Sequence, residues 1–266
     1  MIYLCKYILY FFLYAFFGWC CECIYCSFGD KKVVNRGFLN GPICPIYGFG
    51  ALFIIFLLND YIGDWAIVFT MGLIMTSILE YVTSVILEFL FHSTWWDYSN
   101  RMFNINGRVC LKNSILFGMM SVVLMEIIHP MVVEFVDDIN INYLYILVFL
   151  LILYIIIDIS ITLNSLNKLR YKLERLEEAL EDLKKINIHV KSEKFTEENI
   201  LKSIYNFRQK DDKLKFKIND IYSKLVNIKK KSKVQRRILK AFPNMNHKNR
   251  NEGLKYLKQM LKDKTK

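Results

Sequence analysis

The sequence predicts an all-α membrane protein: a polytopic helix bundle of about five spans, followed by a cytoplasmic helical tail with coiled-coil character. Hydrophobic residues make up 54% of the 266 residues, and the mean hydropathy is +0.23. Long apolar runs of this kind are typical of chains that cross a bilayer. We expect a transmembrane bundle over 1–163, coiled-coil helices over 164–230 and a basic tail over 231–266.

A helix that crosses about 30 Å of hydrocarbon at 1.5 Å per residue needs about 20 residues. The first apolar run is followed by no small-x-small cleavage site, so we expect it to stay as a helix and not to be removed as a signal peptide. Five crossings would place the two termini on opposite sides of the membrane. The predicted spans are residues 7–26, 42–58, 65–91, 114–133 and 141–163.

Lysine and arginine set the orientation, because they collect in cytoplasmic loops. The loop before the second predicted span and the loop before the fourth are basic, whereas the other two loops contain no Lys or Arg. We therefore expect a multi-pass protein of the plasma membrane with a cytoplasmic C-terminal tail. The cations of the two basic loops are Lys31, Lys32, Arg36, Arg101, Arg108 and Lys112.

The tail differs sharply in charge from the bundle. Residues 1–163 carry a net charge of −5 and residues 164–266 a net charge of +16, which give the total of +11. The run of residues 229–240, "KKKSKVQRRILK", holds seven cations. It is either a solvated surface or a site attracted to anionic membrane lipid, where each cation contributes about 1 kcal/mol. Nucleic acid is not favoured as a partner, since the run has no aromatic stacking residues.

Leucines in the first part of the tail alternate spacings of three and four, as in the seam of a coiled coil. A second segment with the same alternation follows over 196–228. The two segments can fold back on each other or pair between subunits as a homo-oligomer, and the spacing alone does not decide. The seam leucines are Leu166, Leu169, Leu173, Leu176, Leu180 and Leu183.

Two residue patterns resemble parts of metal-binding motifs, but neither contains a complete set of ligands in a suitable arrangement. Cys20, Cys23 and Cys26 have the spacing of an iron–sulfur loop, yet on a helix their thiols would be spread over about 120°. Glu126 and His129 match half of a di-iron motif, which needs a second copy. We expect no metal and no cofactor, and we interpret His129-Pro130 as a helix kink or end.

Acidic residues inside predicted spans are the strongest functional indication, because an ionisable group there costs at least about 2.5 kcal/mol. In the third span they join a stripe of serines at helical spacing, which lines either a wet cavity or a helix contact. Glu22 and Asp158 should lie about 8 Å from the cytoplasmic ends of their spans. The acids are Glu22, Glu80, Glu88, Glu126 and Asp158.

The entry to the second span, "NRGFLNGPICPIYGFG" at 35–50, is rich in glycine and proline. Pro42 suits the first turn of a helix, whose free N–H groups attract anions. We therefore expect an anion or headgroup site at the N–H groups of Gly41, Ile43 and Cys44, beside Arg36.

The loop before the fourth span holds too many specific polar residues for a simple connection. Both basic loops should lie on the cytoplasmic side above the inner acids, so we expect one polar site there. The candidate substrate-path or ligand residues are Glu22, Arg36, Asn40, Glu80, Ser84, Glu88, Asp97, Arg101, Asn104, Arg108 and Asp158.

Several blocks in the same order make the chain similar to a known family. They are "GWCCE" at 18–22, the entry to the second span, "LEY" at 79–81, "WWDYSNRMFNINGR" at 95–108 and "HP" at 129–130. Over residues 10–135 the chain closely resembles the family of putative ABC-transporter type IV permeases. The resemblance implies a permease-type subunit. Because the chain has no G-x4-GK[ST] phosphate loop, any ATPase would be a separate subunit.

Two functions remain open on the sequence. As a transporter subunit, the protein would use the inner acids and the polar stripe as a substrate path. As a membrane-embedded enzyme acting on a lipid or polyprenyl headgroup, it would hold phosphate with its loop arginines and use Glu80 or Asp97 as a base. No catalytic residue is assigned, and the transporter is preferred because of the resemblance.

Overall fold

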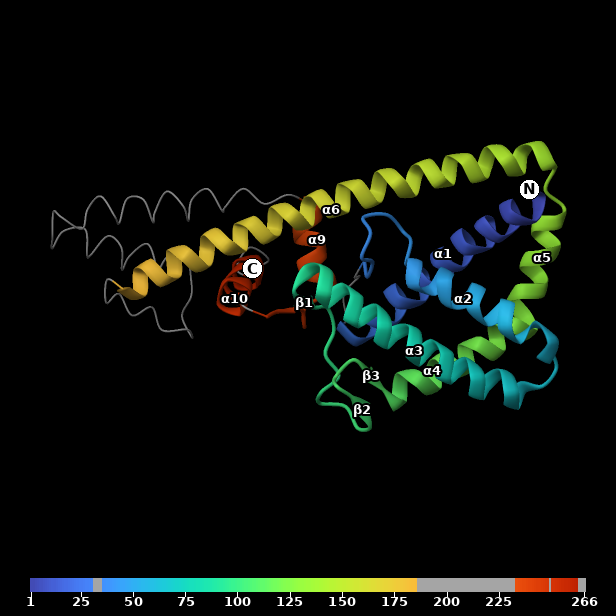
Figure 1. Ribbon diagram of the computed structural model, residues 1–266, viewed down its shortest axis with the longest axis horizontal. Coiled ribbons are helices and arrows are strands. Elements are labelled where there is room, and N and C mark those ends of the chain that lie inside the picture. The colour runs from blue at the N-terminus through green and yellow to red at the C-terminus, as the bar shows by residue number, and fades with distance from the viewer. Residues whose placement is uncertain (31–34, 186–232, 249, 263–266) are drawn as a thin grey trace. The chain divides into compact units, whose positions relative to one another are not determined.

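A computed structural model describes residues 1–30, 35–185, 233–248 and 250–262, and its elements are labelled in Figure 1. The described chain is mostly helical and divides into two compact units, Met1–Thr162 and Leu163–Lys266. The first unit contains the apolar helices, and the second contains the charged tail. The predicted predominance of helix is confirmed.

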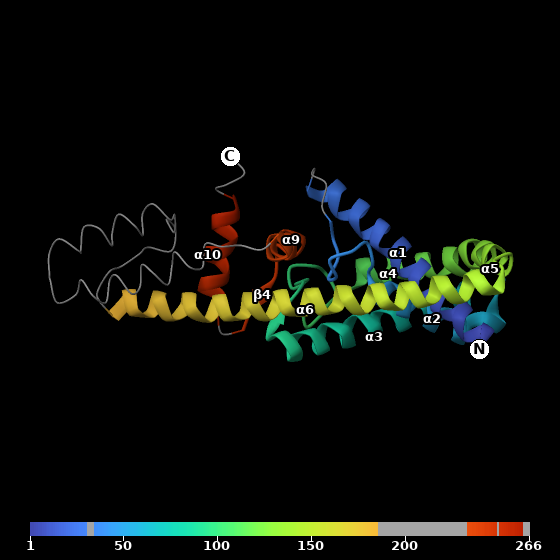
Figure 2. The same ribbon diagram turned by 90° about the horizontal axis from the view of Figure 1, so that it is seen from above.

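Four helical stretches in the described chain are long and apolar enough to cross a membrane, so the chain is a membrane protein. They belong to α1 (Ile2–Asp30), to α3 (Trp65–Phe91), to a continuous run from Leu111 to Asp137, and to α6 (Ile141–Lys185). Each contains or coincides with a predicted span. Figures 1 and 2 both show α6 as one unbroken helix.

The prediction of five helical spans is not confirmed. The helix α2 (Pro45–Leu58) has 14 residues and is followed by a single 3₁₀ turn, η1 (Asn59–Tyr61). At 1.5 Å per residue α2 is about 21 Å long, which is too short to cross alone. It begins three residues after the predicted start, since Cys44 is extended and caps the helix ahead of Pro45.

The bounds of α3 coincide with the predicted third span, and local chemistry explains both ends. At the start, the Asp64 carboxylate accepts a hydrogen bond of 3.1 Å from the Ile67 N–H, as an N-cap residue does. At the end, His92 adopts a left-handed conformation with φ of 54°, and its N–H donates to the Glu88 carbonyl. A left-handed residue after the last turn stops a helix.

The fourth predicted span is interrupted in its C-terminal half. It consists of α4 (Leu111–Val123), the π-helical turn η2 (Leu124–Ile128) and α5 (His129–Asp137). Pro130 has no N–H to donate to the preceding turn, and a wide turn before it accommodates the missing hydrogen bond. The predicted irregularity at His129-Pro130 is thus present as a π turn.

Neighbouring helices of the first unit approach closely where one of them has a small residue. Gly18 of α1 lies against the Tyr47 ring of α2, and Gly72 of α3 lies against Ser121 of α4, so that a Cβ at either glycine would overlap its neighbour. Close packing through small residues is a main source of helix association in membranes. The α1–α2 and α3–α4 pairs are therefore the tightest contacts of the bundle.

The two predicted basic loops meet at one end of the bundle. Phe38 of the first loop packs edge-on against Trp95 of the second, with ring centroids 5.0 Å apart. The second loop contains β1 (Ser93–Thr94) and a hairpin of β2 (Asn104–Ile105) with β3 (Val109–Cys110). Asn106 and Gly107 turn this hairpin with φ of 52° and 67°, as an Asn-Gly turn requires.

The second unit contains the rest of α6, α9 (Lys233–Ala241), β4 (Asn246–His247) and α10 (Asn251–Lys262). Gln235 of α9 donates to the Ser165 carbonyl at 3.2 Å, and the Gly253 N–H of α10 donates to Glu177 at 2.9 Å. Both helices are therefore attached to α6 within one chain.

The coiled coil is not confirmed. Four seam leucines are at most 5% exposed in the single chain, and Leu176 lies beside Gly253 of α10. This burial favours the interpretation in which the seam is covered by the same chain. The segment 196–228 and the side chains of Leu180 and Leu183 lie outside the described residues. The four buried leucines are Leu166, Leu169, Leu173 and Leu176.

Candidate functional site

Residues 35–44, here called the α2 entry segment, are held by the backbone acceptors and carboxylates of other helices. Asp158 of α6 accepts the Asn40 N–H at 2.9 Å with Oδ1 and the Gly41 N–H at 2.8 Å with Oδ2. The Thr162 hydroxyl lies 3.4 Å from the same Oδ1. Because a Cβ at Gly41 would overlap the Tyr154 hydroxyl, glycine is needed for this close approach.

The predicted anion site at the entry to α2 is wrong. All three N–H groups expected to hold the anion are used within the chain: Gly41 donates to Asp158, Ile43 to the Gly41 carbonyl, and Cys44 to the Ala15 carbonyl. The carboxylate of Asp158 occupies the position at which an external anion was expected. A buried carboxylate on such N–H groups satisfies donors that would otherwise be unpaired.

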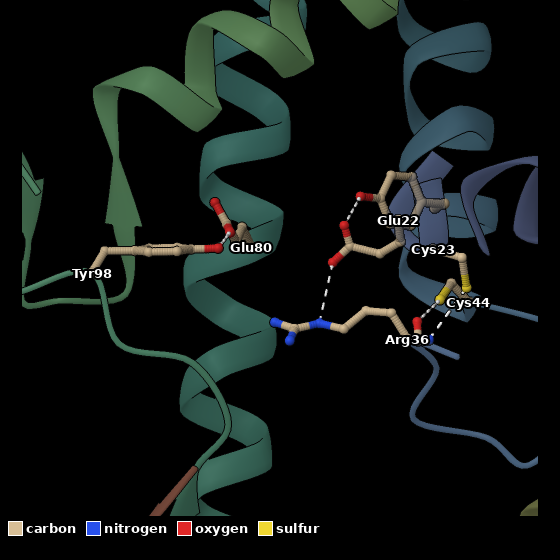
Figure 3. Close-up of polar contacts among 7 residues, drawn as sticks. Glu22, Cys23, Arg36, Cys44, Glu80 and Tyr98 are labelled. Carbon is tan, nitrogen blue, oxygen red and sulfur yellow. Dashed lines mark hydrogen bonds and ion pairs between the residues drawn. The ribbon is translucent and has the colours of Figure 1, made fainter. Parts of the chain in front are cut away.

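The backbone of Arg36 is fixed by two cysteines. Its N–H lies 3.2 Å from Cys23 Sγ, and its carbonyl accepts from Cys44 Sγ at 3.4 Å. The Arg36 side chain then extends toward Glu22, with 3.9 Å between Nε and Oε1 (Figure 3). Both cysteines are free thiols that bond locally, and Cys44 is buried whereas Cys23 is half-buried.

Five side chains from different elements converge at this end of the first unit, and we call them the inner polar cluster. Figure 3 shows Glu22, Arg36, Glu80 and Tyr98, and Tyr47 joins them through its bond to Glu22. The Tyr47 hydroxyl donates to Glu22 at 3.2 Å, and the Tyr98 hydroxyl donates to Glu80 Oε1 at 3.3 Å. Burial raises the pKa of Tyr98 above its usual value, and the negative charges of Glu80 and Glu22 raise it further. Tyr98 therefore keeps its proton and donates to Glu80, as Tyr47 donates to Glu22.

Glu80 is the least satisfied member of the inner polar cluster. The residue is only 6% exposed, yet its Oε2 atom is buried and has no hydrogen-bond partner among the described residues. Its other oxygen has the 3.3 Å bond from Tyr98, which is long for an O–H donor. Since buried polar atoms are normally paired, the missing donor needs an explanation.

Arg108, in the β2–β3 hairpin, belongs to a separate group of polar residues and contacts side chains of α3. Its guanidinium donates to the Ser84 hydroxyl at 3.0 Å and to the Glu88 carboxylate at 2.5 Å. It also lies 5.7 Å from the centre of the Tyr81 ring. These contacts attach the β2–β3 hairpin to α3, and they use the side chains of three predicted ligand residues.

The remaining loop candidates shape the loop itself. Asp97 accepts from the Ser99 hydroxyl and N–H, and these bonds lower the pKa of Asp97. Asn104 donates to the Arg101 carbonyl at 2.8 Å and accepts from the Gly107 N–H at 3.0 Å. Arg101 itself is exposed.

The predicted single site is thus divided into several groups. The structure brings together Glu22, Arg36 and Glu80, and it places the other candidates elsewhere. Tyr47 and Tyr98 were missed as site residues, although both stand within the blocks that carry the family resemblance. Tyrosine is common near membrane interfaces, so neither residue gave a local signal.

Polar residues at the opposite end of the bundle have partners of their own. Glu126 accepts the Gly63 N–H at 2.8 Å, and His129 Nδ1 lies 2.7 Å from the Tyr14 hydroxyl. Within residues 1–30, 35–185, 233–248 and 250–262, no three His, Cys, Asp or Glu residues are grouped as metal ligands would be. Glu126 and His129 therefore have structural contacts in place of the rejected di-iron motif.

Comparison with known proteins gives one match. No curated protein and no solved structure is similar enough to the chain to count as a match. The family model described as "Putative ABC-transporter type IV" matches residues 9–163, which is more than half of the chain and includes every residue of the inner polar cluster. The chain therefore belongs to this family of ABC-transporter-type membrane proteins.

Proposed function

We propose that this chain is the permease-type subunit of a transporter in the plasma membrane, and that the inner polar cluster forms part of the solute path on the cytoplasmic side. The observation that carries the proposal is the convergence of Glu22, Arg36 and Glu80 from three separate segments of an apolar bundle. Charged side chains at such positions are expensive and typically mark a pathway or a ligand site.

The predicted orientation needs a fifth crossing of the membrane, and the α2 entry segment and α2 together can provide it. Residues 35–58 would cross as an extended segment followed by a short helix. Non-helical backbone is tolerated at membrane depth where protein surrounds it and satisfies its polar groups, and Asp158 and Ala15 accept N–H groups here. With this fifth crossing, the basic loops and the C-terminal tail are cytoplasmic.

Cysteine labelling from outside the cell tests this topology. Single cysteines at Tyr3 and Tyr61 should both react with an impermeant maleimide, and one at Ile105 should not. The comparison is made in a background whose native cysteines are replaced by serine or alanine. Labelling at only one of positions 3 and 61 would show that residues 35–58 do not cross.

A separate ATPase subunit would supply the energy, since the chain has no phosphate loop. The two cytoplasmic loops and the tail are the surfaces to which it would bind. The full chain, purified in mild detergent, should copurify with a nucleotide-binding protein and stimulate its ATP turnover. Glu80→Gln and Arg36→Gln should each reduce the stimulation, whereas Glu126→Gln, at the other end of the bundle, should not.

The contacts favour the transporter over the lipid-modifying enzyme. The enzyme would need arginines to hold a phosphate, but the guanidinium of Arg108 contacts Glu88 and Ser84, and that of Arg36 faces Glu22. Turnover of a membrane lipid by the purified chain, in the absence of any ATPase, would overturn the proposal.

A further inference from the structure

The polar groups around the α2 entry segment and the inner polar cluster are used unequally. The Asn40 and Gly41 N–H groups bond to Asp158. Two buried side-chain atoms of the inner polar cluster make no hydrogen bond among the described residues: Arg36 Nε, a donor that forms an ion pair with Glu22, and Glu80 Oε2, an acceptor that forms none. A ligand that pairs with Glu80 Oε2 must therefore donate a hydrogen bond.

Charge leads to the same conclusion. Arg36 lies 3.9 Å from Glu22 and compensates that carboxylate, whereas Glu80 makes no ion pair within the described ranges. Glu22 is also close enough for its negative charge to act on Glu80. An anion brought to Glu80 would be repelled by the Glu80 carboxylate, and a cation would be attracted.

The type of cation follows from the available atoms. A bare metal ion such as Ca²⁺ or Mg²⁺ takes six or more oxygen ligands, and the described chain contains no group of three or more His, Cys, Asp or Glu residues that could hold it. An ammonium group needs only a few directed acceptors, and aromatic rings add to its binding. Glu80 supplies a carboxylate, and Tyr47 and Tyr98 supply aromatic rings within the same cluster.

We infer that the inner polar cluster binds a ligand carrying a primary ammonium group, which donates hydrogen bonds to the carboxylate of Glu80. The inference rests on the proposed transport function, and it identifies the class of solute as cationic. On binding, the ammonium group would supply the donor missing at Oε2 and compete with the long Tyr98 bond at Oε1. This is the opposite charge from the anion that the glycine- and proline-rich entry predicts.

Thermal unfolding of the full chain in detergent tests the inference with ethylammonium chloride as the probe. Three non-hydrogen atoms limit its dissociation constant to the millimolar range at best. At constant ionic strength, ethylammonium should raise the unfolding temperature in a saturable way. Ethyl phosphate, an anion, and tetraethylammonium, a cation without N–H groups, should not.

Variants locate the binding site. Glu80→Gln should weaken ethylammonium binding about tenfold or more, as expected for the loss of a charged hydrogen bond, and Glu126→Gln should bind like the unaltered chain. Glu80→Asp keeps the carboxylate and should retain measurable binding, so it replaces the glutamine variant as the comparison if that variant does not fold.

Several results would overturn the inference. They are an equal response of the unaltered chain and of Glu80→Gln, a saturable response to ethyl phosphate in place of ethylammonium, and an unfolding temperature that changes with pH but not with ethylammonium. None of these would affect the proposed function if the chain still stimulates a nucleotide-binding partner. Conversely, ethylammonium binding without any such partner would contradict the proposed function alone.

Discussion

Asp158 and Glu80 are two acids inside the same apolar bundle, and they are equally buried at 5% and 6% exposure. Asp158 accepts two backbone N–H groups, one on each oxygen, and it fixes the α2 entry segment. Glu80 has one long bond and one oxygen without a partner among the described residues. Burial alone therefore does not distinguish a structural carboxylate from a ligand-binding one. The hydrogen bonds of each oxygen do.

The largest expected effect is the loss of Asp158. Asp158→Ala would remove the acceptor of the part-buried Asn40 and Gly41 N–H groups. A hydrogen bond to a charged group contributes about 1.5–3 kcal/mol, so we expect the free energy of unfolding to fall by about 3–6 kcal/mol. Denaturant unfolding in detergent measures this loss. Retention of full stability would remove the distinction between the two acids.

Gly41→Ala should be the next most damaging change. Its Cβ would overlap the Tyr154 hydroxyl, and forcing the helices apart should destabilise the chain by about 1–3 kcal/mol. Adding Tyr154→Phe removes the overlapping oxygen and should restore part of the stability. Gly50→Ala serves as the control, because its Cβ meets only the end of the Leu79 side chain. If Gly41→Ala and Gly50→Ala lowered the free energy of unfolding equally, the close approach of Gly41 to Asp158 would not be what fixes the α2 entry segment.

Arg108→Gln should have a smaller effect, which is local to the loop. The Arg108–Glu88 pair is partly exposed, at 21% and 27% of the two side chains, so its loss should destabilise by about 1–2 kcal/mol. Hydrogen exchange should become faster in the β2–β3 hairpin and stay unchanged in α1. Glu88→Gln should give the same pattern. Loss of partner ATPase stimulation in Arg108→Gln with an unchanged hairpin would instead assign Arg108 to the solute path.

The smallest effect on stability is expected for Glu80→Gln. The glutamine oxygen can still accept the Tyr98 hydroxyl, and removing a charge that has no ion pair costs little, so the free energy of unfolding should change by less than about 1 kcal/mol. Stimulation of the ATPase should nevertheless be reduced. A loss of several kcal/mol in the same denaturant titration would make Glu80 a structural acid like Asp158.

Local patterns in the sequence were sufficient for the long helices. The third span has the predicted bounds because its apolar run starts at an N-cap residue, Asp64, and ends at a left-handed residue, His92. The same patterns overestimated α2, since Pro42 and Pro45 follow one another and only the second begins the helix. The seam leucines were recognised as an apolar stripe, but the spacing did not show that the four described ones are buried within the single chain.

The sequence by itself determined the membrane class, the family, the four long helices and the acids that carry the highest cost in lipid, because these depend on composition and on spacing within one segment. Only the tertiary structure decided which of these acids has hydrogen-bond partners for both of its oxygens. Asp158 meets Gly41 across 117 residues and Tyr98 meets Glu80 across 18, after each chain segment has taken its place in the bundle. Such contacts depend on how helices pack, and packing gives both oxygens of Asp158 a hydrogen bond while Glu80 Oε2 has none among the described residues.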